Sequence, residues 1–146
     1  MNKKSILITI LIAILLLGCG KEKTNTIIDI RYGPVLFNLA APDSLQKGSQ
    51  AISYIFVDAF DPDGLDDIDS VYFVSTRPDG SSNGIRLYLF DDGQTYDDSV
   101  ANDGRYTIGI QPPDTSSQSG DYTFRFNAFD SQRDPSNTIE KIVTAY

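Results

Sequence analysis

The chain has 146 residues, of which 12 are basic and 20 acidic, and it contains one cysteine, no histidine and no tryptophan. A single cysteine excludes an intramolecular disulfide, and the missing histidine removes the usual zinc ligand set and the commonest general acid-base residue. The net charge of −8 argues against nucleic acid and anionic membrane surfaces as partners, because both attract basic patches.

Taken in chain order, residues 1–18 have the composition of a cleaved secretory signal peptide. Lys3 and Lys4 give it a basic start, and residues 6–17 are apolar except for Thr9, as in the hydrophobic region of such signals. The apolar run is shorter than the roughly 20 residues that a transmembrane helix needs.

The residues that close this segment, Leu16, Leu17, Gly18 and Cys19, resemble the lipobox of bacterial lipoproteins. The resemblance implies acylation of the Cys19 thiol, cleavage between Gly18 and Cys19, and acylation of the new amino group. Two or three acyl chains anchor a protein stably to a bilayer, whereas one chain does so only marginally. The alternatives are an ordinary cleaved signal peptide with an incidental thiol, or an uncleaved anchor.

The same resemblance predicts a location in the cell envelope. Gly20, rather than aspartate, follows the cysteine, which implies the outer membrane if the host has one. Residues 19–33 are predicted to tether the lipid to a folded domain at 34–146, and residues 20–26 are small, polar or charged, as suits a flexible spacer. Without the signal peptide the chain holds 10 basic and 20 acidic residues, a net charge of −10.

From Ile27 onward, short apolar or aromatic runs alternate with clusters of Asp, Gly, Pro, Ser and Asn. This pattern is typical of an all-β sandwich, and we expect minimal helix. Seven strands are predicted, the number in an immunoglobulin-like sandwich, at residues 35–40, 52–60, 70–75, 85–90, 105–110, 121–129 and 138–145. The clearest is 121–129, where aromatic or apolar residues alternate with polar ones.

Two predicted strands end in similar sequences, Asp-Ala-Phe-Asp at 58–61 and Asn-Ala-Phe-Asp at 127–130. In immunoglobulin topology these strands lie on opposite sheets and finish at the same end. Aligning Ala59 with the inward-facing Ala128 places Ile55 and Val57 in the core.

The same register places Tyr54 and Phe56 on the outer face of their sheet. Tyr72, Tyr88 and Phe90 are expected to join them there, and contiguous exposed aromatic residues would mark a contact surface. The alternative is that residues 27–32 pack over these side chains.

Several acidic and glycine-rich runs resemble the immunoglobulin-like modules, of fibronectin or cadherin type, in secreted and surface proteins of bacteria. These runs are residues 38–45, 61–64, 66–68, 91–93 and 101–106. The resemblance covers roughly residues 34–146. It implies an immunoglobulin-like sandwich that serves as a stalk, spacer or binding platform.

The acidic residues are unevenly distributed, since twelve aspartates fall in or beside three connections that immunoglobulin order places at one end. They are Asp58, Asp61, Asp63, Asp66, Asp67, Asp91, Asp92, Asp97, Asp98, Asp103, Asp130 and Asp134. Crowded carboxylates repel one another, and Ca²⁺ with oxygen ligands would relieve that repulsion. The predicted ligands are Asp61, Asp63, Asp91, Asp92 and Asp103. The alternative is that these aspartates only form turns, since no complete EF-hand loop is present.

The sequence therefore predicts an envelope-anchored lipoprotein that displays one immunoglobulin-like module for binding or structural assembly at the cell surface. Its expected partners are the bilayer, through acylated Cys19, and an envelope protein or glycan, but not nucleic acid. One alternative is a calcium-dependent adhesion or glycan-binding module. Another is a carboxylate-dependent hydrolase, which needs two carboxylates across a cleft; a small sandwich with acids on its loops offers no evident cleft, so we do not expect an enzyme.

Overall fold

The computed structural model describes residues 32–146. The predicted signal peptide, Cys19 and most of the predicted tether lie outside these residues. The strands are β1 (Val35–Ala40), β2 (Ser44–Leu45), β3 (Ser53–Phe60), β4 (Ile68–Thr76), β5 (Arg86–Leu89), β6 (Arg105–Ile110), β7 (Gly120–Asp130) and β8 (Ile139–Ala145), with one 3-10 turn, η1 (Leu65–Asp67). Among residues 32–146 no helix is long and apolar enough to cross a membrane.

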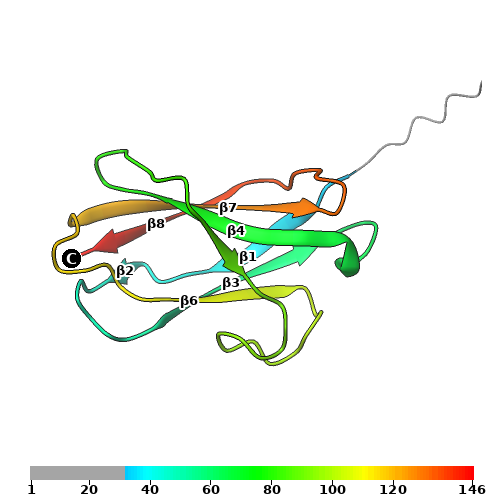
Figure 1. The fold of residues 1–146 in the computed structure, drawn as a ribbon, viewed down its shortest axis with the longest axis horizontal. Coiled ribbons are helices and arrows are strands. Elements are labelled where there is room, and N and C mark those ends of the chain that lie inside the picture. The colour runs from blue at the N-terminus through cyan, green and yellow to red at the C-terminus, as the bar shows by residue number, and fades with distance from the viewer. Residues whose placement is uncertain (1–31) are drawn as a thin grey trace, which may run out of the picture. The chain divides into compact units, whose positions relative to one another are not determined.

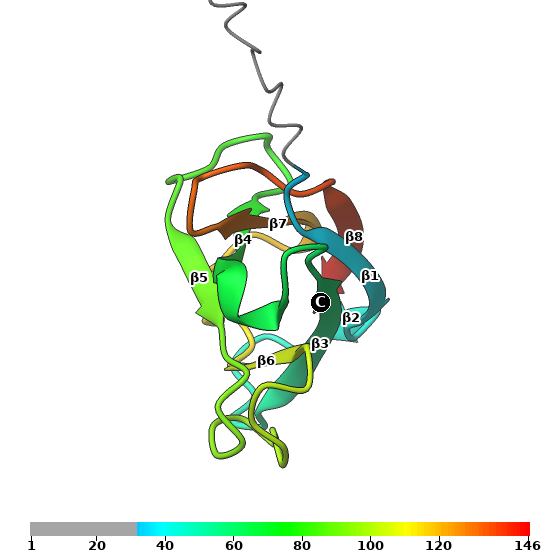
Figure 2. The same ribbon diagram turned by 90° about the vertical axis from the view of Figure 1, so that its right-hand side faces the viewer.

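The strands form two sheets that pack face to face (Figures 1 and 2). One sheet has the order β1-β3-β6 and the other the order β2-β8-β7-β4-β5. Neighbouring strands are antiparallel except for β2 and β8, which run parallel. This division of the strands is that of an immunoglobulin-like sandwich, so the predicted all-β class is confirmed.

The predicted count of seven strands is wrong, because the described residues contain eight. The additional strand, β2, has two residues, Ser44 and Leu45, which pair with Thr144 and Ala145 at the end of β8. A strand of two residues shows no alternation of apolar and polar side chains in the sequence. It forms because its main chain pairs with the edge of β8. The predicted strands at 35–40 and 105–110 match β1 and β6 in both bounds.

The core lies between the sheets and follows the predicted alternation. Ile55, Val57 and Ala59 of β3 are buried, and so are Phe124, Phe126 and Ala128 of β7. The ring of Phe73 in β4 lies 4.8 Å from that of Phe124 and 5.1 Å from that of Phe126, which gives the core a packed aromatic centre.

Three connections meet at one end of the sandwich, and we call residues 61–67, 91–104 and 130–138 the acidic end. The main-chain N–H of Ala59 donates to the carbonyl of Gly104 at 2.8 Å, and that of Ser131 donates to the carbonyl of Asp67 at 2.7 Å. The described chain also enters here, because a side chain on Gly33 would contact the carbonyl of Pro135 at 2.5 Å.

Candidate functional site

The aspartates of the acidic end form two separate groups. In one group Asp61, Asp67 and Asp130 each offer a carboxylate oxygen, and these oxygens lie within 4.8 Å of one another. Asp91, Asp98 and Asp103 form the second group by the same measure. We call them the inter-sheet group and the loop group.

The inter-sheet group joins residues from both sheets. Asp61 directly follows β3, Asp67 closes the turn η1, and Asp130 is the last residue of β7. Asp61 is only 1% exposed and Asp130 only 2%, whereas Asp67 is half-buried. Three carboxylates from two sheets therefore meet where solvent has little access.

Each carboxylate of this group has one oxygen engaged with a donor. Asp61 Oδ1 accepts from the N–H of Asp63 at 2.8 Å, and Asp67 Oδ1 accepts from the Ser131 hydroxyl. Asp130 Oδ1 accepts from the N–H groups of Gln132 and Asp134 at 2.9 and 2.7 Å. These hydrogen bonds fix the orientation of the three carboxylates and engage the Oδ1 atom of each.

The second oxygens are different. The Oδ2 atoms of Asp61 and Asp67 are buried and have no hydrogen-bond partner, and the same holds for Asp134, which is not a member of the group. Buried polar atoms are almost always hydrogen-bonded, and a buried charge without a partner is costly. The inter-sheet group is therefore chemically incomplete.

The loop group is satisfied by main-chain donors. Asp98 accepts from the N–H groups of Gly93 and Val100 at 2.5 and 3.3 Å. Asp91 accepts from those of Asp103 and Gly104 at 3.3 and 2.9 Å. These carboxylates build the loop between β5 and β6, which is the turn-forming role that aspartate commonly plays.

The predicted calcium ligands are thus divided by the structure. Asp61 belongs to the inter-sheet group, Asp91 and Asp103 belong to the loop group, and Asp63 and Asp92 belong to neither. Asp92 instead accepts from Thr95 and Gln94, and the bonds from Thr95 in particular lower its pKa.

Sequence reasoning missed Asp67 and Asp130 as members of a common group. A signal for Asp130 was present, because Asp61 and Asp130 are the final residues of the two similar sequences at 58–61 and 127–130. Asp67 had no such signal. It reaches the group through its bonds with Ser131, which depend on how two distant loops meet.

The predicted aromatic surface is also divided, and the expectation is wrong for Tyr72 and Tyr88, whereas Phe90 pairs with Thr107 of β6, in the sheet that contains Phe56. Tyr54 and Phe56 lie on β3, with ring centroids 6.5 Å apart, whereas Tyr72 and Tyr88 lie on β4 and β5 of the other sheet. Alternation along a strand tells which residues share a face of that strand, but it does not tell to which sheet the strand belongs.

Tyr72 is moreover covered. It is 6% exposed, with the guanidinium of Arg86 4.3 Å from its ring centroid. The ring of Phe129 stacks beside it at 6.1 Å and that of Tyr88 lies at 6.0 Å. Cation–π and aromatic contacts within the domain therefore cover the ring of Tyr72 on the outer face of the larger sheet.

The outer face of β1-β3-β6 carries a larger apolar surface than was predicted, which we call the aromatic face. In addition to Tyr54 and Phe56 it includes Val35, Phe37, Ile52, Phe60 and Tyr96. Tyr54 is 41% exposed and Phe60 54%. Tyr96 reaches this face because its ring lies over Gly109, where a Cβ would be 2.7 Å from Tyr96 Cδ1.

One ion pair lies in the middle of the aromatic face. Arg105 Nε is 3.1 Å from Asp58 Oδ1, and Asn38 Nδ2 donates to Asp58 Oδ2 at 3.0 Å. Asp58 raises the pKa of the Arg105 guanidinium through this hydrogen bond and its charge. The face therefore combines exposed aromatic rings with a fixed polar centre.

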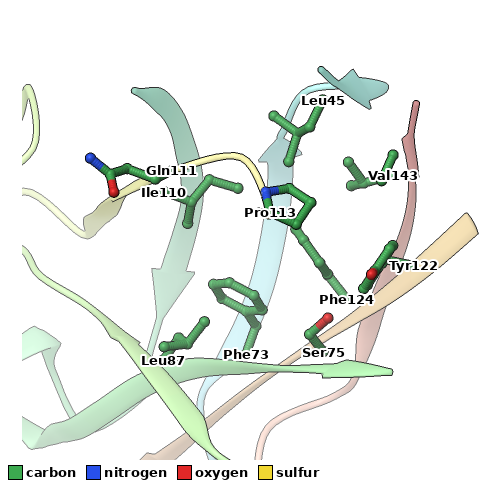
Figure 3. Close-up of a pocket in the computed structure, with 11 residues that line it drawn as sticks. Leu45, Phe73, Ser75, Leu87, Ile110, Gln111, Pro113, Tyr122, Phe124 and Val143 are labelled. Atoms are coloured by element: carbon green, nitrogen blue, oxygen red, sulfur yellow. The ribbon is translucent and has the colours of Figure 1, made fainter. Parts of the chain in front are cut away.

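A pocket lies between the sheets at the end away from the acidic loops (Figure 3). It has a volume of about 160 Å³ and is lined mainly by apolar side chains, among them Leu45, Phe73, Phe124 and Val143. This is smaller than the roughly 300–1,000 Å³ of pockets that hold drug-sized ligands. Its lining includes no carboxylate.

No family model matches the sequence, and no curated protein is similar to it. Among solved structures, the chain is similar to the PKD domain of an M14-like peptidase from a Thermoplasmatales archaeon, with 15% identity, a TM-score of 0.49, and coverage of 80% of this chain and 98% of that one. It is also similar to fibronectin(III)-like modules of Clostridium thermocellum CbhA, with 18% identity and a TM-score of 0.47 over 80% of this chain.

The chain spans 48% of the CbhA chain. A third similar structure is AggA, the major subunit of aggregative adherence fimbriae type I from Escherichia coli, with 11% identity, a TM-score of 0.38, and coverage of 80% of this chain and 98% of that one. At these low identities the likeness concerns the fold alone.

Proposed function

We propose that the protein is a lipoprotein of the cell envelope, anchored through acylated Cys19, whose immunoglobulin-like domain binds another surface component through the aromatic face. The anchoring rests on the lipobox-like residues 16–19. The binding role rests on one structural observation, the difference between the two outer faces of the sandwich.

The outer face of the larger sheet exposes fewer large apolar side chains, chiefly Tyr88 and Ile142, and its strands are joined by polar side-chain pairs. Arg125 and Glu140 form an ion pair of 2.7 Å across β7 and β8, and Asn127 Nδ2 donates to the Thr138 hydroxyl at 2.6 Å. The aromatic face on the smaller sheet instead exposes a set of large apolar side chains. Contiguous apolar surface of this kind marks interaction sites on soluble domains.

Aromatic side chains around a fixed charge pair are also what protein interfaces use. Tyrosine and phenylalanine bury large areas with few rotatable bonds, and the charged groups give orientation. The favoured partner is therefore an envelope protein, with the ion pair of Asp58 and Arg105 setting the register of contact.

Hydrolysis by carboxylates finds no comparable support. In residues 32–146 both aspartate groups lie at the acidic end, while the apolar pocket lies at the other end and has no carboxylate in its lining. Asp69 and Asp91 do line another hollow, of about 400 Å³, but main-chain N–H groups engage both oxygens of Asp91, so Asp91 is committed to the loop and not free to act as acid or base.

Anchoring is tested with Cys19→Ser expressed in the native host. The variant is expected to lose the acyl chains and to leave the membrane fraction or accumulate unprocessed, while the wild type stays with membranes. A processed Cys19→Ser protein that fractionates with membranes would contradict the proposal of a lipid anchor.

Binding is tested by placing a photo-crosslinking residue at position 54 or at position 142 in intact cells. Tyr54 is in the aromatic face, and Ile142 is an exposed apolar residue, 58% exposed, on β8 of the other sheet. A discrete crosslinked product is expected from position 54 only, and Phe37→Ser should weaken it. Equal crosslinking from both positions, or none from position 54, would contradict a role for this face.

A further inference from the structure

The buried, unpartnered carboxylate oxygens between the two sheets require a positive charge or donor that residues 32–146 do not provide. The ion pairs in this part of the chain join Arg105 to Asp58, Arg125 to Glu140 and Lys141 to Asp43, and none reaches the inter-sheet group. Asp61, at 1% exposure, has one oxygen on the Asp63 N–H and the other on nothing.

We infer that Asp61, Asp67 and Asp130 form a Ca²⁺ site that connects the two sheets at the acidic end. This inference does not rest on the proposed function of the aromatic face. It rests on the convergence of three carboxylates within 4.8 Å and on the free oxygens of Asp61 and Asp67.

The spacing suits a calcium ion. Ca²⁺ binds oxygens at about 2.3–2.6 Å, so two of its ligands are separated by at most about 5 Å, and the three carboxylate oxygens, which all lie within 4.8 Å of one another, meet that limit. Mg²⁺ binds oxygens at about 2.0–2.1 Å, needs near-octahedral geometry and usually keeps several waters, so a cluster of several protein carboxylates favours Ca²⁺. All three side chains offer only oxygen, the ligand of a hard cation.

Asp134 touches the group through its main chain and is not one of the converging carboxylates. Its N–H donates to Asp130 Oδ1 at 2.7 Å, and its own Oδ2 is buried and unpartnered. Ca²⁺ takes six to eight oxygen ligands, some of them from bidentate carboxylates and water. The ligands beyond the three carboxylates would then be second carboxylate oxygens and water.

The hydrogen bonds already present orient the ligands. Main-chain N–H groups and the Ser131 hydroxyl hold one oxygen of each carboxylate, which leaves the opposite oxygen for the ion. The loop group lacks this feature, because main-chain N–H groups engage both oxygens of Asp91 and of Asp98. The loop group therefore serves as an internal control.

The experiment uses the full chain in detergent, freed of metal with EDTA, in thermal melts and calorimetric titrations. Calcium should bind with one ion per chain and raise Tm by several degrees, because a ligand that binds only the folded state stabilises it. Magnesium should raise Tm much less, and sodium chloride at matched ionic strength should not reproduce the calcium effect. An equal rise in all three solutions would overturn the inference.

The variant Asp61→Asn should lower calcium affinity at least tenfold. In EDTA it should melt no lower than the wild type, because a neutral amide replaces a buried charge that has no counter-charge and only one of its oxygens hydrogen-bonded. Asp103→Asn in the loop group is the matched control and should bind calcium as the wild type does. Should Asp61→Asn fail to fold, the half-buried Asp67→Asn carries the same expectation, and unchanged calcium affinity in that variant would overturn the site.

Discussion

The side-chain amide of Asn137 binds both main-chain groups of Leu36, although the two residues are 101 positions apart. Asn137 Oδ1 accepts from Leu36 N at 2.7 Å, and Asn137 Nδ2 donates to Leu36 O at 3.0 Å. Leu36 is itself buried in the core. The Asn137 side chain thus makes the two main-chain hydrogen bonds that a neighbouring strand would otherwise make with Leu36.

Replacing this amide should destabilise the domain. Asn137→Ala removes two hydrogen bonds and leaves the partly buried N–H and C=O of Leu36 without partners, at a cost of about 2 kcal/mol. The check is the midpoint of urea unfolding. Asn127→Ala is the control, because it removes one exposed hydrogen bond to Thr138 and should cost well under half as much. Equal losses in the two variants would contradict the special role of Asn137.

Alanine substitutions at two glycines should distinguish the cost of a positive φ angle from the cost of a steric contact. Gly104 and Gly80 have positive φ angles of 86° and 82°. A Cβ on Gly104 would lie 2.9 Å from the carbonyl oxygen of Ala59, whereas a Cβ on Gly80 meets nothing within 4 Å. Gly80→Ala should therefore cost about 1 kcal/mol from φ alone, and Gly104→Ala clearly more. Unfolding midpoints that fall equally would show that the contact with Ala59 is readily relieved.

Tyr106 should be the last tyrosine to ionise. Burial first, and the charge of Asp91 second, raise its pKa from 10.0 to about 12. Because the folded-state pKa is raised, its contribution to stability is complete below pH 10 and is lost as pH rises through 12. A phenolate absorbance titration should show a late step that Tyr106→Phe removes. A single step near pH 10 for all 8 tyrosines would contradict this assignment.

Asp79 should remain ionised in strong acid. Hydrogen bonds from Ser81 first, and from Gln118, lower its pKa from 3.8 to about 2. A lowered folded-state pKa contributes stability above pH 3.8 that is lost as pH falls through 2. Carboxyl chemical shifts followed by NMR should show the late protonation, and Gln118→Ala should move it upward. Protonation of Asp79 together with the other exposed acids would contradict it.

Most of the strand pattern could be predicted because each strand buries alternate residues against the other sheet. Ile55, Val57 and Ala59 are a clear case, since their burial follows from alternation alone. Strand β2 could not be predicted, because Ser44 and Leu45 pair with Thr144 and Ala145, which are far away in the sequence.

The candidate site was predicted in part for the same reason. Asp61 and Asp130 end strands whose directions the sequence indicates, so their common end was expected. Asp67 becomes a neighbour only through its bonds with Ser131. Likewise, no pattern within β5 shows that Tyr88 pairs with Tyr72 rather than joining the sheet of Tyr54.

The entry of the chain at the acidic end has a mechanical consequence. Residue 32 leads through Gly33 and Pro34 into β1, which begins at this end and runs away from it. A force that pulls on residue 32 away from the domain therefore acts along the axis of β1. The hydrogen bonds between β1 and β3 and the two hydrogen bonds from Asn137 are then loaded together, in shear, and do not open one after another. We therefore expect β1 to resist being pulled out of the domain.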